Sequence, residues 1–196
     1  PTRRSSDLCI VLNLIQQGAG SWNRIGRKVQ LSSLRLYGIA EYRYTPSAGG
    51  GALAANTLRM VVVWDKQPSG NAIPTFDTVF GVTAQDGTES TSYLDPIKYD
   101  NMDRFSILRD VRLSFNPDIF NNAGGTSDLC TKQANFDEYL KLNNREVVFS
   151  GQSAPMTIAD ISTGALYIYF RAQGATDEVT DWQIVNASAR VRYFDQ

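Results

Sequence analysis

The stretch Arg24-Ile-Gly-Arg-Lys-Val-Gln-Leu-Ser-Ser-Leu-Arg-Leu-Tyr-Gly38 decides the fold of this chain. A basic, glycine-containing lead-in runs directly into a long segment of alternating apolar residues. Val29 and Leu31 alternate with polar residues, and the phase then shifts at Ser32-Ser33 so that the next two leucines face the same side. Period-two alternation predicts a half-buried strand over 28–44, and the phase shift predicts a bulge or bend within it.

Strand signals also dominate the rest of the chain. Runs of β-branched and aromatic residues alternate with clusters of Gly, Pro, Asn and Ser, which is the pattern of strands and turns. A proline followed by apolar residues at helical spacing predicts one or two helical turns over 74–80. Further strands are expected over 57–65, 92–98, 104–115, 136–142, 145–150, 164–171 and 183–194. About eight strands with one short helix predict an all-β, antiparallel sandwich or barrel.

The segment 104–115 is predicted to bury one face against the core. Its apolar residues mostly share one parity, with Arg109 as an interruption. The residues expected on that face are Phe105, Ile107, Val111, Leu113 and Phe115.

Composition bounds the class of protein. The 196 residues suffice for one domain with a real core, and 42% hydrophobic with 11% aromatic residues indicates a globular chain. No apolar run approaches the roughly 18 residues of a membrane helix. A formal net charge of -1 argues against a surface that binds polyanions all over, although local basic patches remain compatible with it.

The chain contains no histidine, which removes the usual general base, Ser-His-Asp and Cys-His catalysis, and histidine-bearing zinc sites. Its two cysteines, Cys9 and Cys130, are too few for a thiolate zinc cage, and they are interpreted as unpaired thiols. Acidic clusters in the loops lack EF-hand spacing and are interpreted as solvated side chains. We therefore expect no cofactor, no metal and no catalytic residue.

Three blocks carry a family resemblance. They are the opening stretch to Gly38, then Leu58-Arg-Met-Val-Val-Val-Trp-Asp-Lys-Gln67 with its following turn and helix, and finally Asp103-Arg-Phe-Ser-Ile-Leu-Arg-Asp110. In this order they resemble coat proteins of small satellite plant viruses and of circular, replication-protein-encoding single-stranded DNA viruses. The resemblance covers 16–193, nearly the whole domain.

The resemblance implies an eight-stranded antiparallel jelly-roll sandwich with one short helix after the second strand. It implies a structural, non-enzymatic subunit that assembles with copies of itself into a small icosahedral shell enclosing a nucleic-acid genome. The expected partners are other copies of the chain and viral nucleic acid, with no membrane. The expected location is the virion, with assembly in the host nucleus or cytoplasm.

The N-terminal region is divided into two parts. Residues 1–8 resemble the translation of a sequencing adapter and are interpreted as a non-native tail, with a short native polar tail as the alternative. Residues 9–26 form a lead-in, and 27–196 form a single jelly-roll capsid domain. Related coat proteins begin with a basic arm that neutralises packaged nucleic acid. We expect this arm to be missing from the sequence.

Four residues are predicted to carry function. Arg24, Arg27 and Lys28 sit where a basic arm would join the domain and are expected to touch phosphates, with a solvated lead-in or intersubunit salt bridges as the alternative. Trp22, in a polar glycine-rich segment, is expected at a subunit contact. Arg190 and Arg192 form a second basic pair on the polar face of the last predicted strand, and a role in surface solubility is preferred there over nucleic-acid contact.

Two other functions remain as alternatives. A carbohydrate-binding jelly-roll module would present exposed aromatic side chains in a groove. A jelly-roll hydrolase would need two carboxylates about 5–9 Å apart, a spacing that the sequence does not specify.

Overall fold

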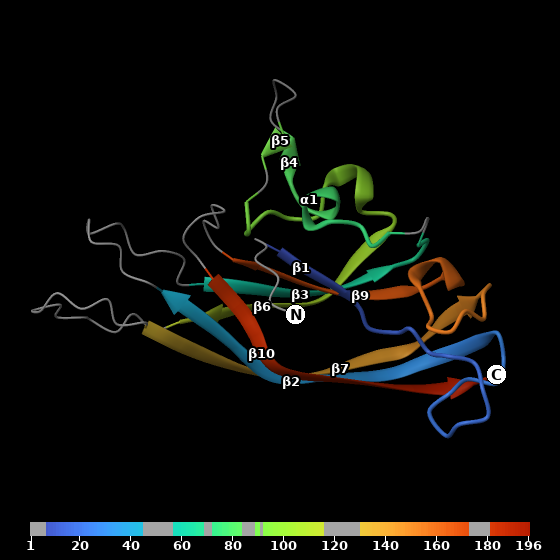
Figure 1. Cartoon of the computed structure of the whole chain (residues 1–196). Coiled ribbons are helices and arrows are strands. Elements are labelled where there is room, and N and C mark those ends of the chain that lie inside the picture. Colours follow the sequence, from blue (N-terminus) through green and yellow to red (C-terminus); the bar gives the residue numbers. More distant parts are fainter. Residues whose placement is uncertain are drawn as a thin grey trace, which may run out of the picture.

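Two four-stranded antiparallel sheets face one another in a β-sandwich (Figure 1). The structure is a computed structural model that describes residues 7–44, 57–68, 72–83, 89–90, 92–115, 130–172 and 181–196. The first sheet, here the β3 sheet, has the order β1 (Asp7–Val11), β9 (Ala165–Ala172), β3 (Thr57–Asp65) and β6 (Phe105–Ser114). The second, the β2 sheet, has the order β10 (Asp181–Asp195), β2 (Lys28–Tyr44), β7 (Cys130–Phe149) and β8 (Ile161–Thr163).

Several short elements lie outside the two sheets. A helical turn, α1, lies between β3 and the small β4–β5 hairpin, and two 3-10 turns precede β6 and β8. Their bounds are α1 (Phe76–Val79), β4 (Val82–Thr83), β5 (Glu89–Ser90), η1 (Tyr99–Asn101) and η2 (Ile158–Asp160).

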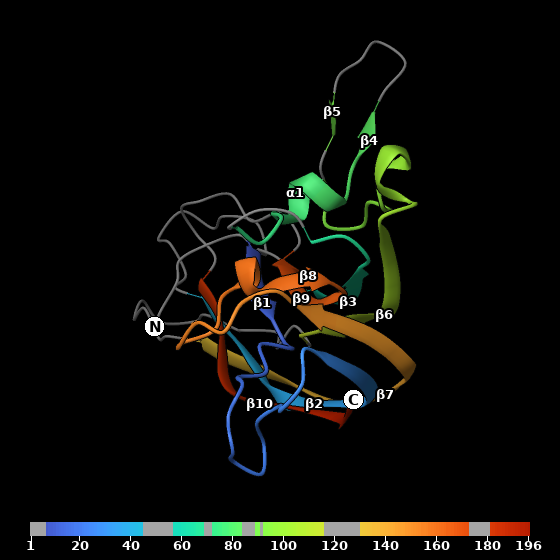
Figure 2. The same cartoon turned by 90° about the vertical axis from the view of Figure 1, so that its right-hand side faces the viewer.

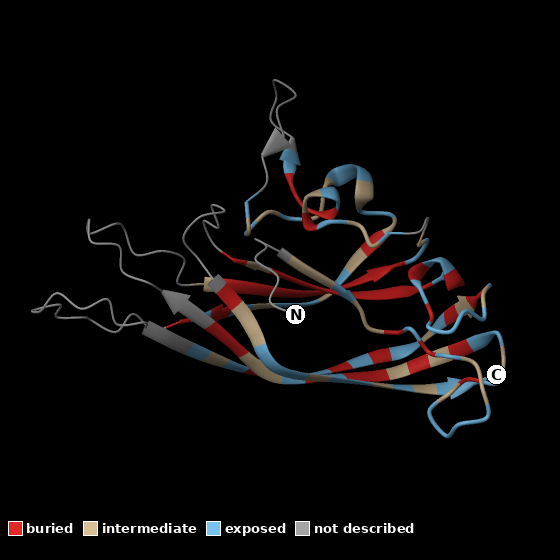
Figure 3. Ribbon diagram, viewed as in Figure 1, coloured by how far each residue is buried: buried red, intermediate tan, exposed pale blue. Residues whose placement is uncertain are grey.

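Apolar side chains fill the space between the sheets. Buried positions alternate with more exposed ones along β2 and β7, whereas β3 and β9 are buried almost throughout (Figure 3). Met60 on β3 lies opposite Phe170 on β9 in the β3 sheet. The Phe170 ring lies 5.9 Å from that of Phe136, which comes from the β2 sheet. Burying a large apolar side chain contributes about 1.5–3 kcal/mol, so this layer is the main stabilising feature of the sandwich.

The other face of the β3 sheet is covered as well. The rings of Phe76 and Phe80 on and after α1 stack 4.5 Å apart, and both meet Tyr169 of β9 edge to face. Arg59 is buried beneath them, where it pairs with Asp110 at 2.7 Å. A strand covered on both faces reads as a continuous apolar run, which accounts for the sequence of β3.

The phase shift predicted at Ser32 is confirmed as a bend of the β2 sheet. The register of β2 shifts between Leu31 and Ser33 against both neighbours, β7 and β10. On β7, Asn143 and Asn144 take left-handed backbone angles of φ 52 and 55 at this point. Asparagine tolerates that conformation, so the chain bulges without breaking the ladder. The two strands expected over 136–142 and 145–150 are therefore one long strand, β7.

The prediction that Phe105 and Ile107 share one face of 104–115 with Val111, Leu113 and Phe115 is wrong. A bulge shifts the pairing of β6 with β3, so that Ile107 lies opposite Val63 while Arg109 lies opposite Val62. Consecutive residues of β3 face opposite sides, and the bulge thus moves the second half of β6 to the other face. Arg109 joins the inner side, where it contacts Glu138 of β7 at 2.7 Å.

The expected strands 28–44 and 57–65 match β2 and β3, whereas 92–98 forms turns and a single bridge between Ile97 and Phe80. β1 was not expected, and it pairs along β9 from Asp7 onward. The origin of residues 1–8 stays a prediction, and 1–6 lie outside the described residues.

Candidate subunit-contact and nucleic-acid site

The predicted functional residues gather on the loop that joins β1 to β2. Figure 2 shows this loop projecting below the sandwich beside β2 and β10. The loop closes on itself through backbone hydrogen bonds: the Gly18 N–H donates to Arg24 O, and the Arg24 N–H donates to Gln16 O, both at 3.0 Å. The tip between these bonds carries Trp22.

Arg24 anchors the loop from inside. Its side chain is fully buried, and its three guanidinium nitrogens donate to the carbonyls of Ile15 (3.1 Å), Gly26 (2.6 Å) and Gly151 (2.8 Å). The guanidinium also lies 4.2 Å from the centre of the Phe149 ring. One side chain thus ties the β1–β2 loop to the end of β7 and to the loop that follows it.

Two nearby carboxylates partly offset the effect of burial on the charged guanidinium of Arg24. Burial lowers the pKa of its guanidinium, while the negative charges of Asp195 and Asp160 raise it. Arginine starts from so high a pKa that the side chain stays protonated and acts as a fixed donor fork.

A second set of contacts holds the loop from the C-terminal strand. The Asp195 carboxylate accepts hydrogen bonds from the backbone N–H groups of Ile25 and Gly26. The Tyr193 hydroxyl donates to the carbonyl of Trp22 at 2.9 Å. Gly26 is required here because a Cβ at this position would lie 2.3 Å from the Gln196 carbonyl oxygen. Backbone and side chains together therefore fix the loop on β10.

The same contacts leave two large apolar side chains outside. Trp22 is 79% exposed and Ile25 is 77% exposed. Exposed apolar groups of this size on a fixed loop are typical of protein contact sites. The prediction that Trp22 sits at a subunit contact remains a prediction, and its exposure is compatible with it.

The structure separates the three cations that the sequence grouped together. Arg27 and Lys28 are exposed, and Lys28 pairs with Glu146 at 3.5 Å in solvent. Arg24 points into the protein, and a phosphate cannot reach its guanidinium while the loop keeps this conformation. Two of the carbonyls that bind Arg24, those of Ile15 and Gly26, are close in sequence, but that of Gly151 lies 127 positions away, and a local sequence pattern does not reveal such a contact.

The loop after β7 is itself held by a buried carboxylate. Asp160 accepts hydrogen bonds from the Thr157 backbone N–H (2.8 Å), the Thr157 hydroxyl (3.0 Å) and the Ser153 hydroxyl (2.9 Å). Its carbonyl also receives the N–H groups of Ser150 and Gly151. These bonds, led by the one from the Thr157 backbone, hold the pKa of Asp160 below its usual value despite the opposing effect of burial.

Basic residues also gather away from the loop. Strand pairing places Arg35 directly opposite Arg190, with Lys141 and Arg192 flanking Ser33 in the next row of the same sheet. Sequence reasoning weighed the arginines of β10 without their neighbours. Only the register of three strands brings these cations together.

Two further findings concern other classes of site. Within the described residues, no helix has the length and apolar character needed to cross a bilayer. The same part of the chain holds no group of three or more acidic or cysteine side chains placed to bind a metal ion.

Comparison with known proteins gives one family. Residues 3–195 match the family described as geminivirus coat protein/nuclear export factor BR1 family. The match covers nearly the whole chain, including both sheets and the β1–β2 loop. A search of curated protein sequences found no match.

We expect Arg24→Ala to lower the free energy of unfolding by about 2–5 kcal/mol, because it leaves buried carbonyls without their charged donor. The matched control is Arg27→Ala, which removes an exposed arginine three residues away and should change stability by less than about 0.5 kcal/mol. Urea unfolding followed by tryptophan fluorescence measures both. Equal stability of the two variants would show that Arg24 does not anchor the loop.

The lowered pKa of Asp160 predicts an acid-sensitive contribution to stability. The carboxyl binds its proton less readily in the folded chain than in the unfolded chain, where its pKa is about 3.9. Its contribution is therefore complete above about pH 4 and is lost as the pH falls through the lower folded value. Asp160→Asn should reduce stability at pH 7 and flatten the fall below pH 4 in thermal melts. An unchanged acid limb in the variant would contradict this role.

Proposed function

The chain belongs to the geminivirus coat protein/nuclear export factor BR1 family, and we propose that it is a capsid subunit whose sandwich is wound as a jelly roll. Copies of the chain would close into a small icosahedral shell around a nucleic-acid genome. The observation that carries this proposal is the family match over residues 3–195 of a two-sheet antiparallel sandwich.

The proposed jelly-roll winding is supported by the strand order. The first and last long strands, β2 and β10, lie side by side in one sheet, while β3, which follows β2 in sequence, lies in the other. Chains that cross repeatedly between two sheets form Greek-key sandwiches, of which the jelly roll is the eight-stranded form. Such a subunit presents loops at its ends for contacts with neighbours.

Self-association would use the β1–β2 loop. Tryptophan is the side chain most often found at the energetic centre of protein interfaces. The backbone at Trp22 and Ile25 is held in place by Tyr193 and Asp195, so little backbone entropy is lost when a neighbouring copy covers this loop. In a closed shell each contact is repeated by symmetry, and a modest gain per contact is therefore multiplied over the particle.

Contact with nucleic acid would begin beside this loop. Arg27 and Lys28 are exposed at the start of β2 and are the members of the predicted basic group that a phosphate can reach. A virion component of this kind works by binding and burial rather than by catalysis. We place its assembly in the nucleus or cytoplasm of the host cell.

The family also covers the nuclear export factor BR1, and this gives a second function to separate from the first. An export factor would engage nucleic acid without closing into a shell. A carbohydrate-binding module, the other alternative, would remain a monomer and bind glycans. Particle formation therefore distinguishes the proposed function from both.

We expect the purified chain, mixed with single-stranded DNA, to form uniform small spheres in negative-stain electron microscopy. Trp22→Ala should leave the subunit folded but reduce the assembled fraction in sedimentation velocity at least tenfold, because an interface anchor is worth about 2 kcal/mol or more. Tyr99→Ala is the control, since it removes an 88%-exposed aromatic side chain on η1. Similar assembly of both variants would refute the role of Trp22, and a chain that stays monomeric in all conditions would refute the capsid function.

A further inference from the structure

We propose that the outer face of the β2 sheet binds single-stranded nucleic acid directly, with phosphates on a cluster of cations and a base in an adjoining hollow. The proposed site lies farther along β2 than the basic lead-in at Arg27 and Lys28. The inference rests on the proposed function only in so far as a capsid encloses a genome.

Strand register creates the cation cluster. Arg190 on β10 lies directly opposite Arg35 on β2, and Arg192 and Lys141 lie on either side of Ser33 in the adjacent row. Residues two apart on a strand share a face, and the two rows are therefore only about 7 Å apart. Four cations from three strands thus occupy a small area of one face.

This cluster carries a surplus of positive charge. Asp137 pairs with Arg35 at 2.9 Å, but both side chains are more than half exposed, and such pairs contribute little. Arg190, Arg192 and Lys141 have no ion pair with any residue in the described parts of the chain. Like charges placed directly opposite on neighbouring strands destabilise a sheet. A bound polyanion would relieve that repulsion. The net charge of the whole chain is -1, so the positive charge is local to this cluster.

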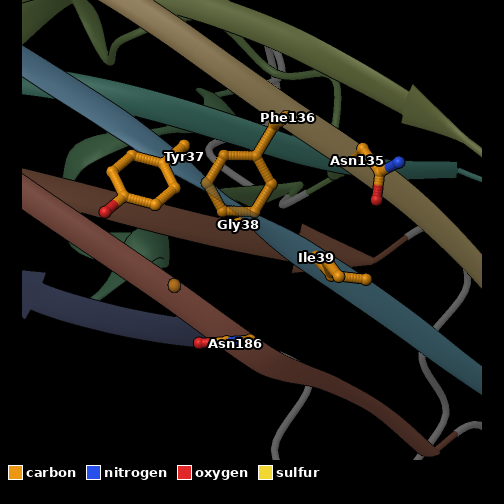
Figure 4. Close-up of a pocket in the computed structure, with 7 residues that line it drawn as sticks. Tyr37, Gly38, Ile39, Asn135, Phe136 and Asn186 are labelled. Carbon is orange, nitrogen blue, oxygen red and sulfur yellow. The ribbon is translucent and has the colours of Figure 1, made fainter.

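An apolar hollow adjoins the cations along the same strands (Figure 4). It has a volume of about 360 Å³, and Gly38 is one of the residues that line it. The Tyr37 ring, half exposed, stands at one end, one row from Arg35. The full lining is Tyr37, Gly38, Ile39, Asn135, Phe136, Asn186 and Ala187.

The chemistry of the hollow suits a nucleobase. A base is flat and apolar on its faces and carries donors and acceptors on its edge. Tyr37 and Ile39 offer apolar contact, while the side-chain amides of Asn135 and Asn186 both donate and accept hydrogen bonds. Aromatic stacking beside a basic track is the usual arrangement for binding single strands without sequence preference.

A single strand fits this face better than a duplex does. Bases of a duplex are stacked inside the helix and cannot enter a hollow on a flat sheet, whereas those of a single strand can be splayed out. A second copy of the chain would have to bring several carboxylates to the same place. The charge of the face therefore favours nucleic acid, and a protein contact becomes an alternative outcome of the test.

The test measures binding of the full chain to a fluorescein-labelled oligothymidine of about 16 nucleotides by anisotropy, over a range of salt concentrations. Arg190→Ala should weaken binding and reduce the slope of log K against log salt by about 0.7, the value for one lost phosphate contact on a single strand. Arg112→Ala removes one exposed arginine from β6 in the other sheet and should leave the slope unchanged.

The hollow is tested in the same assay. Tyr37→Ala should weaken binding about 5- to 150-fold at an unchanged salt slope, because it removes stacking and no charge. Tyr99→Ala is its control, an exposed tyrosine on η1. Circular dichroism confirms that each variant is folded before its affinity is compared.

Each outcome decides between the alternatives. If Arg190→Ala and Arg112→Ala weaken binding equally, attraction is general and the proposed face is refuted. If the variants of this face alter sedimentation but not oligonucleotide binding, the face is a protein contact and the proposal also fails. Electron microscopy of the same samples keeps the two claims apart. Shells without binding at this face would overturn the inference alone, whereas binding at this face without shells would overturn the capsid function alone.

Discussion

The buried guanidinium of Arg24 is the interaction on which the position of the β1–β2 loop depends. It connects the β1–β2 loop to Phe149 at the end of β7 and to Gly151 just beyond it. The planar guanidinium holds its donors in a rigid fork that reaches several carbonyls in defined directions, whereas the lysine ammonium is a compact point charge on a flexible stem. Because Arg24 holds the loop from within, the side chains of Trp22 and Ile25 remain outside in a defined position. The loop, held by Arg24 and by β10, thereby offers an apolar contact surface.

The two sheets have different roles in the domain. The central strands of the β3 sheet, β9 and β3, are covered on both faces, between the interior of the sandwich and the aromatic cap of α1, so they serve mainly to stabilise the domain. The β2 sheet buries one face and leaves the other to solvent. Its bend at Ser32, matched by the bulge at Asn143 and Asn144, allows long strands to continue past the sandwich core. The open face of these long strands carries the clustered cations and the hollow at Gly38.

Much of this fold could be predicted from local patterns. Alternation with period two predicted the bounds of β2 and β3, and the phase shift at Ser32 predicted the bend. The pattern failed where pairing between strands decides the outcome. The bulge in β6 that turns Arg109 inward depends on its register with β3, and the continuity of β7 depends on two asparagines that look like a turn in the sequence.

For the candidate sites too, local features could be predicted from the sequence and long-range contacts could not. The basic residues of the lead-in were visible in the sequence, but the burial of Arg24 arises from carbonyls up to 127 positions away. The most direct test of the capsid account is a cryo-electron microscopy reconstruction of particles assembled with single-stranded DNA. The account predicts closed shells in which Trp22 is buried between neighbouring copies. Shells with Trp22 facing solvent would contradict the assigned contact, and a failure to form shells at all would contradict the account as a whole.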